Sequence, residues 1–408
     1  MKMEIKHRNC AVCRNNESIT IYKQPIGSIV GIGDIEYVHK IDRCNVCGFI
    51  FANSILQENE ILKYYEKMSN YENPEHSGLH SEMRKQSIEK QINFILGHLP
   101  KNFKGSALDI GCSVPYGLSV LKIKGWKVLG LDPSDSCIII AKDLWNIDVK
   151  KGFFNIENFE DEKPFDLIIL SHVLEHLIYP SEILSQLKEI LSEDGVIYIE
   201  VPNLLEHNNL TGYFTFEHIN YFTPLSLENI VKNNGFEIRK IQLIKNDESE
   251  LSYSSVGVLI QKSQSVNSVI NVDNSSIAAV EEYKAQIGNR IKKINSVLNM
   301  IDKTIKKGRL ALWGGGIHTS QLLSETNLRE MDIFCIYDND PKKNGECILS
   351  IPIYTFPNDI NMVLKNVDAI LISSQASENE IYNQISKFEK SGLKIFRLYQ
   401  MAEQLNTN

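Results

Sequence analysis

The chain has 408 residues, of which 43% are hydrophobic and 23% charged. At roughly 100–200 residues per domain this length allows two to four domains, and the composition is that of an ordinary globular protein. A net charge of −8 and the lack of any Lys/Arg run argue against nucleic acid or a membrane surface as a partner. No window reaches the roughly 18 consecutive apolar residues that cross a bilayer, and the N-terminus has no signal-peptide stretch. We therefore expect a cytoplasmic protein that acts on small molecules.

Cysteines are concentrated near the N-terminus, where two C-x2-C pairs are separated by thirty residues. In a cytosolic chain this spacing favours zinc over disulfides. Two such pairs complete a closed tetrahedral site with no open position for chemistry, so the predicted role is structural. Two disulfides, or a redox-active pair, are the alternative. The predicted zinc ligands are Cys10, Cys13, Cys44 and Cys47.

The middle of the chain has the pattern of a doubly wound sheet. Residues 55–98 show helical spacing of apolar residues on either side of a polar stretch, SNYENPEHSG. From Ala107 onward, short apolar runs such as ALDIG, KVLGLD, DLIIL and GVIYIEVP alternate with helical segments. This alternation predicts a parallel sheet with helices on both faces. A hairpin-like pair, FEIRKIQLI and SVGVLIQK, follows and is expected to close the sheet.

A Ser/Asn-rich linker at 263–276 precedes a helix of about 25 residues, marked by apolar residues from Ile287 to Ile305. Beyond it, RLALWGGG, IFCIYDND, DAILISS and LKIFRLY predict a second, smaller doubly wound domain. The expected fold class is therefore α/β with Rossmann-like architecture used twice. The expected division is a zinc-binding module at 1–54, the first doubly wound domain with its helical lead-in at 55–262, a linker and long helix at 263–306, and a Rossmann-like domain at 307–408.

The run DIGCSVPYG leaves the carboxyl end of the first central strand, which is where doubly wound sheets hold a nucleoside. Gly111 would let a ligand approach the backbone closely. Asp132 lies 21 residues later at the end of the second strand, where a carboxylate would accept both ribose hydroxyls. Taken singly, Gly111 is also explained as a turn glycine and Asp132 as a helix cap. The residues predicted for this site are Asp109, Gly111, Cys112, Ser113, Asp132, Pro133 and Ser134.

This order of motifs, together with FDLIILSHVLEHL and GVIYIEVPN, resembles the class I S-adenosylmethionine (AdoMet) methyltransferases over residues 80–262. The resemblance implies that the loop after the first strand cradles the methionine part of AdoMet. It also implies that Asp132 binds the ribose and that the segment with Ser171 and His172 lines the methyl-donor pocket. Where the family commonly has a G-x-G pair, this chain has Ser113 and Pro115, so a backbone donor is lost and the loop is stiffer.

The whole layout, with a four-cysteine module, an AdoMet domain and a Rossmann-like C-terminal domain, resembles the sugar C-methyltransferases of deoxysugar pathways. These enzymes add a methyl group to carbon 3 of a 4-keto nucleotide sugar. The resemblance implies active-site roles for Glu217 and His218 in TFEHINYFT, and for Tyr71 in the polar loop. The family also has a tyrosine two residues before the Glu, and here that position is Thr215.

The chemistry of C-methylation explains why such residues are wanted. A base with a pKa near neutrality must remove a proton next to the ketone while donors stabilise the enolate, which then attacks the sulfonium methyl. His218 is the predicted base, oriented by Glu217 or another carboxylate. Tyr71, Tyr213 or Tyr221 is predicted to donate to the enolate oxygen.

Two reservations concern the histidines. His176, in LEHL, is either a further catalytic residue or a packing histidine, and His172 is expected to touch ligand rather than transfer a proton. The segment E-H-x-x-Y-F-T also occurs in other AdoMet-domain proteins, where it partly serves to dock a loop, so His218 has a structural alternative as well.

In the C-terminal domain, LALWGGGIHTS places Gly314 and Gly316 at the turn after a strand, with Asp338 22 residues beyond Gly316. This is a weak dinucleotide-binding fingerprint, because Thr319 replaces the third small residue. The family resemblance implies that this domain helps to hold the nucleotide sugar, with His318 near a base or phosphate. A purely structural Rossmann-like domain is the alternative.

The sequence thus predicts a cytoplasmic, zinc-containing, AdoMet-dependent methyltransferase that acts on carbon of a nucleotide-activated 4-keto sugar. One alternative is a sugar O-methyltransferase, in which His218 deprotonates a hydroxyl. The other is a nucleotide-sugar-binding or scaffold protein that no longer uses AdoMet, for which Ser113 and Pro115 are the best evidence.

Overall fold

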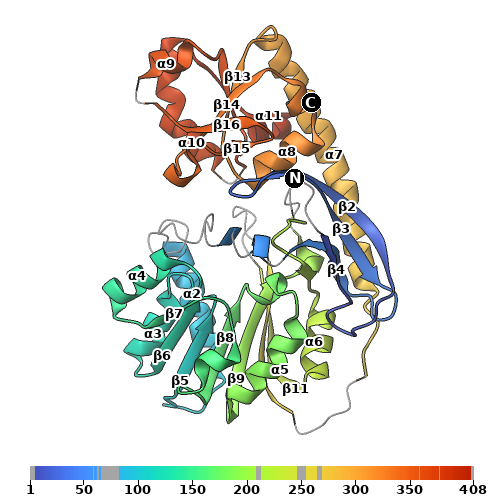
Figure 1. Cartoon of the computed structure of the whole chain (residues 1–408), viewed down its shortest axis with the longest axis vertical. Coiled ribbons are helices and arrows are strands. Elements are labelled where there is room, and N and C mark those ends of the chain that lie inside the picture. The colour runs from blue at the N-terminus through green and yellow to red at the C-terminus, as the bar shows by residue number, and fades with distance from the viewer. Residues whose placement is uncertain are drawn as a thin grey trace.

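The computed structural model describes most of the chain in three parts (Figure 1). A large sheet with its helices lies below, the C-terminal domain lies above, and the N-terminal strands and the long helix α7 run alongside both. None of the helices in the described part is long and apolar enough to cross a membrane. The described residues are 5–57, 59–61, 64–65, 82–207, 213–245, 254–263, 269–357, 359–375 and 377–405.

The N-terminal module is an antiparallel sheet of order β1-β4-β3-β2, to which β10 adds by pairing with β4. Its two long strands, β2 and β3, form a hairpin in which β2 is the edge strand. The cysteine pairs lie in the turns between strands, the first after β1 and the second between β3 and β4. The strands are β1 (Ile5–His7), β2 (Ser18–Ile29), β3 (Gly33–Cys44), β4 (Ile50–Leu56) and β10 (Asn220–Tyr221).

The central domain confirms the predicted doubly wound sheet. Seven strands run in the order β11-β12-β9-β8-β5-β6-β7, parallel from β9 to β7, and the antiparallel pair β11 and β12 closes the sheet as expected. The strands are β5 (Ser106–Ile110), β6 (Lys127–Asp132), β7 (Val149–Lys151), β8 (Phe165–Ser171), β9 (Leu191–Pro202), β11 (Phe236–Ile244) and β12 (Ser255–Lys262). The helices are α2 (Glu82–Gly97), α3 (Tyr116–Ile123), α4 (Asp135–Trp145), α5 (Pro180–Ile190) and α6 (Pro224–Asn233).

Alternate residues of the central strands point to opposite faces, as the two-residue period of a strand requires. Leu108 and Ile168 pack with α5 and α6, whereas their neighbours Ala107 and Leu167 pack with α2, α3 and α4. Burial on both faces explains why these strands read as continuous apolar runs. The chain leaves β5 toward β6 on one side, and β8 follows on the other, so the crevice for a ligand lies at the carboxyl ends of these strands.

The C-terminal domain is a six-stranded sheet of order β15-β16-β14-β13-β17-β18, parallel except for β15. It fits the expected second Rossmann-like fold. The strands are β13 (Leu310–Trp313), β14 (Ile333–Asp338), β15 (Cys347–Ile348), β16 (Ile351–Thr355), β17 (Ala369–Ile372) and β18 (Lys394–Arg397). The helices are α8 (Ile317–Glu325), α9 (Ile360–Leu364), α10 (Glu378–Ile385) and α11 (Leu398–Gln404).

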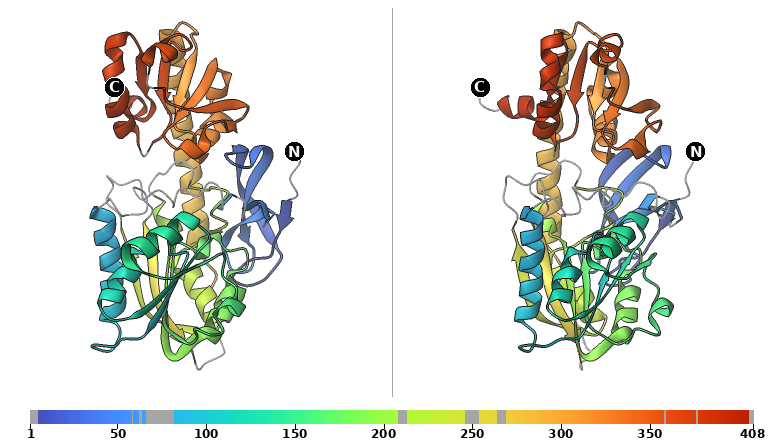
Figure 2. Two further views of the ribbon diagram at one scale, coloured as in Figure 1. Left: turned by 60° about the vertical axis from the view of Figure 1, so that its left-hand side comes forward. Right: turned by 90° about the vertical axis from the view of Figure 1, so that its left-hand side faces the viewer.

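Helix α7 (Ser275–Thr304) is 30 residues long, somewhat longer than expected, and serves two cores. Its first half packs against the N-terminal sheet through Val280 and Tyr283, and its second half enters the core of the C-terminal domain through Val297 and Ile301. The β2–β3 hairpin also reaches the C-terminal domain, where Ser320 Oγ donates to the carbonyl of Ser28 (2.6 Å). Figure 2 shows α7 extending along both domains beside the N-terminal strands.

Candidate active site and cysteine cluster

The turn after β5 is built for close contact between backbone and ligand. Gly111 has φ +69°, and a Cβ there would lie 2.7 Å from Val173 Cγ2, so a larger residue would not fit. Ser113 follows in the left-handed region at φ +49°. Pro115 directly precedes α3, so the stiff residue shapes the entry to this helix.

Asp132 joins the two turns of this site. Its buried carboxylate accepts the backbone N–H of Ser113 (2.8 Å) on one oxygen and that of Ser134 (2.9 Å) on the other. Each oxygen therefore retains a lone pair for a ligand hydroxyl. The alternative in which Asp132 caps the following helix is wrong, because Ser134 is the N-cap and its Oγ accepts the N–H of Cys137.

Asp109 is half-buried near the end of β5, directly before this turn. Burial, together with the nearby Asp132, raises the pKa of Asp109 to about 8, so it is largely protonated at neutral pH. The carboxylate at the sheet edge is thus Asp132. The other predicted members of this set, Cys112 and Pro133, lie in the same two turns. These residues fit a nucleoside with a ribose at Asp132.

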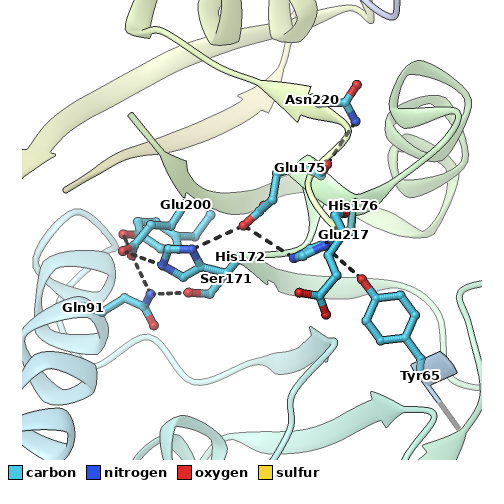
Figure 3. Close-up of polar contacts among 10 residues, drawn as sticks. Tyr65, Gln91, Ser171, His172, Glu175, His176, Glu200, Glu217 and Asn220 are labelled. Carbon is cyan, nitrogen blue, oxygen red and sulfur yellow. Dashed lines mark hydrogen bonds and ion pairs between the residues drawn. The ribbon is translucent and has the colours of Figure 1, made fainter. Parts of the chain in front are cut away.

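A second group of polar side chains gathers where β8 and β9 end (Figure 3). Its centre is Glu175, whose side chain is 1% exposed. Neither of its carboxylate oxygens makes a hydrogen bond of good geometry within the described residues. The nearest groups are His172 Nδ1 at 3.3 Å and His176 Nε2 at 3.8 Å, and His218 faces the same carboxylate. The sequence did not single out Glu175.

His172 lies between two carboxylates. Its Nδ1 is 3.3 Å from Glu175 and its Nε2 is 3.5 Å from Glu200. Burial alone would lower the pKa of His172, but these two carboxylates raise it to about 10. Glu200 is fixed in turn by the Tyr198 hydroxyl (2.7 Å) and by Gln91 Nε2 (2.8 Å). His172 is therefore a cation at neutral pH and does not act as a base in this state.

His176 is held in a defined orientation. Its Nδ1 lies 2.9 Å from the carbonyl of Glu217, and because a carbonyl can only accept, this nitrogen carries the proton. Tyr65 Oη is 3.0 Å from the same nitrogen. Its Nε2 lies 3.8 Å from a carboxylate oxygen of Glu175. The carbonyl of Glu217 thus fixes His176 directly.

His218 is 8% exposed, and its ring lies 4.7 Å from that of His176. Burial, and next the neighbouring His176, lower the pKa of His218 to about 3, although Glu175 opposes this. The imidazole is therefore neutral and can accept a proton, but its pKa lies below the near-neutral value expected for the base.

The carboxylate that faces His218 is Glu175 rather than Glu217. The carboxyl group of Glu217 bonds with Tyr64, and burial raises its pKa. Glu175 therefore lies closest to the role of the other carboxylate, and orientation of His218 by a carboxylate stays a prediction. An acidic residue between two histidines in the run HVLEHL was the signal that could have identified Glu175.

Three tyrosines were predicted to donate to the enolate oxygen, and the structure describes the surroundings of two of them. Tyr213 is buried among aromatic rings, and Tyr221 donates its hydroxyl to the carbonyl of His218. Tyr71 lies outside the described residues. The roles predicted for these three tyrosines stay predictions.

The residues of the C-terminal domain that were predicted to bind a nucleotide sugar lie in two turns at the ends of β13 and β14 and at the start of α8. Gly314 has φ +117° and Gly316 directly precedes α8. Asp338 accepts the backbone N–H of Gly315 (2.7 Å), in the glycine turn after β13, and pairs with Lys343 (3.1 Å), so its carboxylate joins the two turns. The ring of His318 bonds with the hydroxyl of Tyr399, and burial lowers its pKa to about 4. Binding of a nucleotide sugar here stays a prediction.

The four N-terminal cysteines come together as free thiols, with all Sγ atoms within 4.8 Å of one another. Cys10 and Cys47 are 3.5 Å apart, and Cys13 and Cys44 are 3.4 Å apart. Zinc–sulfur bonds of about 2.3 Å in a tetrahedron place sulfurs roughly 3.8 Å apart, so the cluster has nearly the size of a zinc site.

Both cysteine turns share one backbone form. The residue after each pair, Arg14 at φ +63° and Gly48 at φ +77°, is left-handed, and its N–H donates to the carbonyl of the pair's first cysteine. This turn directs both thiols of a pair to the same side.

A family model described as a methyltransferase domain matches residues 80–241. The protein is an AdoMet-dependent methyltransferase. The matched residues contain β5 to β9, most of β11 and both turns at Asp132. This match favours an enzyme over the alternative of a scaffold protein that no longer uses AdoMet.

Three relatives resemble this methyltransferase. An uncharacterised methyltransferase of Staphylococcus carnosus is 29% identical over 171 residues, which cover 37% of this chain and 80% of that protein. A ubiquinone biosynthesis O-methyltransferase of Rickettsia typhi is 24% identical over 236 residues, which cover 52% of this chain and 96% of that protein. The C-methyltransferase NovU of Streptomyces niveus is 24% identical over 165 residues, covering 38% of each chain.

We expect Asp132→Ala to weaken AdoMet binding more than tenfold, a loss of roughly 1.5–3 kcal/mol, because a charge-assisted contact to the ribose is removed. Calorimetric titration of the purified methyltransferase with AdoMet measures this. Asp135→Ala is the matched control, because this exposed carboxylate three residues later pairs only with Lys151 (2.7 Å) among the described residues. Equal affinity of the two variants, with both folded, would show that Asp132 serves the loops alone.

Proposed function

We propose that this methyltransferase transfers the methyl group of AdoMet to carbon of a nucleotide-activated 4-keto sugar, through an enolate that His218 forms. The observation that carries the proposal is the neutral, buried imidazole of His218 beside the buried carboxylate of Glu175, next to the segment that follows β8. The likeness to a C-methyltransferase supports attack by carbon. The order of a four-cysteine module, a methyltransferase domain and a Rossmann-like domain, which resembles that of the sugar C-methyltransferases, supports a nucleotide sugar as the substrate.

In this mechanism His218 accepts the proton from the carbon next to the ketone, which leaves an enolate. Glu175 stabilises the imidazolium that forms, because it lies in the same buried space and carries the opposite charge. His176 is held by the carbonyl of Glu217 and keeps the ring of His218 in place. AdoMet supplies the methyl group, and the enolate carbon takes it as the S–CH3 bond breaks.

Two further groups of residues would bind the methyl donor and the nucleotide. Asp132 and the turn at Gly111 hold AdoMet, and the turn with Gly314, Gly316 and His318 holds the nucleotide part of the sugar. The protein works in the cytoplasm on this small molecule, with neither nucleic acid nor a membrane as partner, in keeping with its net charge of −8.

O-methylation is a second candidate that one observation favours. Ligand atoms of Glu175, His176 and His218 lie within 4.8 Å of one another, a grouping that could hold a metal ion. A divalent cation there would lower the pKa of a bound hydroxyl, and His218 would then be a ligand rather than a base. The likeness to an O-methyltransferase is in keeping with this candidate.

Hydrogen exchange separates the two candidates. If His218 removes a carbon-bound proton, the AdoMet-free protein should exchange that hydrogen of a 4-keto nucleotide sugar with D2O, as mass spectrometry would show. His218→Ala should reduce exchange and methylation by a factor on the order of 10²–10⁴. Glu175→Gln should slow both about tenfold or more, because a charge that stabilises the imidazolium is lost.

Glu217→Gln is the matched control for Glu175→Gln, and we expect the smaller effect there because its carboxyl group bonds with Tyr64. A sugar that is methylated on turnover yet takes up no deuterium beyond the enzyme-free rate would count against C-methylation. Full activity of His218→Ala would remove this histidine from the mechanism.

We also propose that the cysteine cluster binds one Zn²⁺ per chain in a closed, structural site. Metal analysis of the purified protein should give one zinc per chain, and Cys44→Ser should abolish it, because three thiolates leave the tetrahedral site incomplete. Cys335→Ser, at a buried cysteine of the C-terminal domain, is the control that should leave the zinc content unchanged. Two disulfides and no zinc in the parent protein would overturn the proposal.

A further inference from the structure

Arg8, two residues before the first cysteine of the cluster, has a buried guanidinium group that is 9% exposed. Its Nε donates to the carbonyl of Ala52 (2.8 Å) and its Nη1 to that of Ile178 (3.2 Å). Its Nη2 donates to the carbonyl of Ile219 and to Oδ1 of Asn220 (2.9 Å). Among the described residues no carboxylate forms an ion pair with Arg8, so its positive charge is met by backbone and amide oxygens.

These acceptors lie beside the residues proposed for catalysis. Ile178 follows His176 by two residues, and Ile219 follows His218 directly. One guanidinium therefore holds both segments that carry the histidines. The third carbonyl, that of Ala52, belongs to β4 of the N-terminal module.

Further bonds connect the same two segments. Asn220 Nδ2 donates to the carbonyls of Leu174 (3.1 Å) and Leu177 (2.7 Å), and the N–H of Ile219 donates to the carbonyl of Glu175 (2.9 Å). The N–H of Ala52 also donates to the carbonyl of Ile219 (2.9 Å). Each of these bonds joins only two of the three segments, whereas Arg8 bonds with β4 and with both histidine segments.

The form of the guanidinium explains why it fixes geometry. Its donors form a rigid planar fork, so the directions of its acceptors are set together rather than one by one. The guanidinium carries its charge at neutral pH. A buried charge is strongly destabilised unless its hydrogen bonds are made, so displacement of either histidine segment would be opposed.

We propose that Arg8 is a positioning residue for methyl transfer, by which the N-terminal module holds the His176 and His218 segments in their reacting arrangement. The inference rests on the proposed role of His218. It assigns the module a part in the chemistry, through the geometry of the site, in addition to stability.

Arg8→Met removes the fork, and Arg8→Lys keeps the charge as a single point donor. Arg43→Met is the matched control, because Arg43 is also in the module and also donates to a backbone carbonyl, that of Asp273 (3.3 Å), far from the histidines in the chain. The ring signals of His176 and His218 are followed by NMR in histidine-labelled full-length protein. They are assigned with His176→Ala and His218→Ala.

We expect both signals to move in Arg8→Met and, to a smaller extent, in Arg8→Lys, and to stay in place in Arg43→Met. AdoMet affinity, measured by calorimetry, should remain within about threefold in all three variants, because Asp132 and its turns do not contact Arg8. Unmoved signals in folded Arg8→Met would overturn the proposal. If Arg8→Met does not fold, unmoved signals in Arg8→Lys would do the same.

Kinetics give a second, separate readout. With a 4-keto nucleotide sugar that shows exchange, Arg8→Met should lower kcat by a factor on the order of 10–100 and leave KM within about threefold. An unchanged kcat would contradict the positioning role. If no sugar shows exchange, the proposed function fails, and the NMR comparison still decides whether Arg8 sets the histidine geometry.

Discussion

The site depends on the burial of one charge. Glu175 is an ionised carboxylate with almost no contact with water, and its pKa is lowered because His172, His176 and His218 lie around it despite the opposing effect of burial. An isolated carboxylate in this place would be unstable by several kcal/mol. The three imidazoles must therefore stay close to it, and this requirement fixes the loops that carry them.

The loops in turn depend on the N-terminal module. Strand β10 pairs with β4, so the segment after His218 is part of the module's sheet and not of the central one. Removal of the module would leave β10 unpaired and the carbonyl of Ile219 without the donors Arg8 and Ala52. The cysteine cluster lies at the base of the same strands, so a metal there would stabilise the active site through this pairing.

The sequence predicted the central sheet well because each strand there is buried on both faces and is therefore a continuous apolar run. The closing hairpin and the helix of α7 were visible for related reasons, since burial leaves a regular pattern along the chain. The cysteine cluster could be predicted because thiol ligands must lie close in sequence within each turn.

The sequence predicted the chemistry less completely. Pairing of β4 with β10 joins residues about 170 positions apart, and no local pattern encodes it. Glu200 stands alone in the apolar run VIYIEVP, and Glu175 lies between two histidines in HVLEHL. Each pattern signals a buried acid but not its partner. Asp338 had the expected spacing, and its carboxylate bonds with the glycine turn after β13 and with Lys343. Spacing identifies candidates, whereas their partners are set by tertiary contacts.

Charge accounts for the direction of the proposed reaction. His218 is neutral before it accepts a proton and positive afterwards, while the methyl donor loses the positive charge of its sulfonium. The total charge of the site thus stays constant, and the positive charge moves from the sulfonium to the imidazole beside Glu175, whose ionised carboxylate partly offsets the cost of burying it. His172 is already a cation paired with Glu200, so it offers no second place for the proton. The pKa of His218 is low before the reaction because the ring is buried among neutral and positive imidazoles. Its proton is therefore readily returned to water once the methyl group has been transferred, which restores the base for the next cycle.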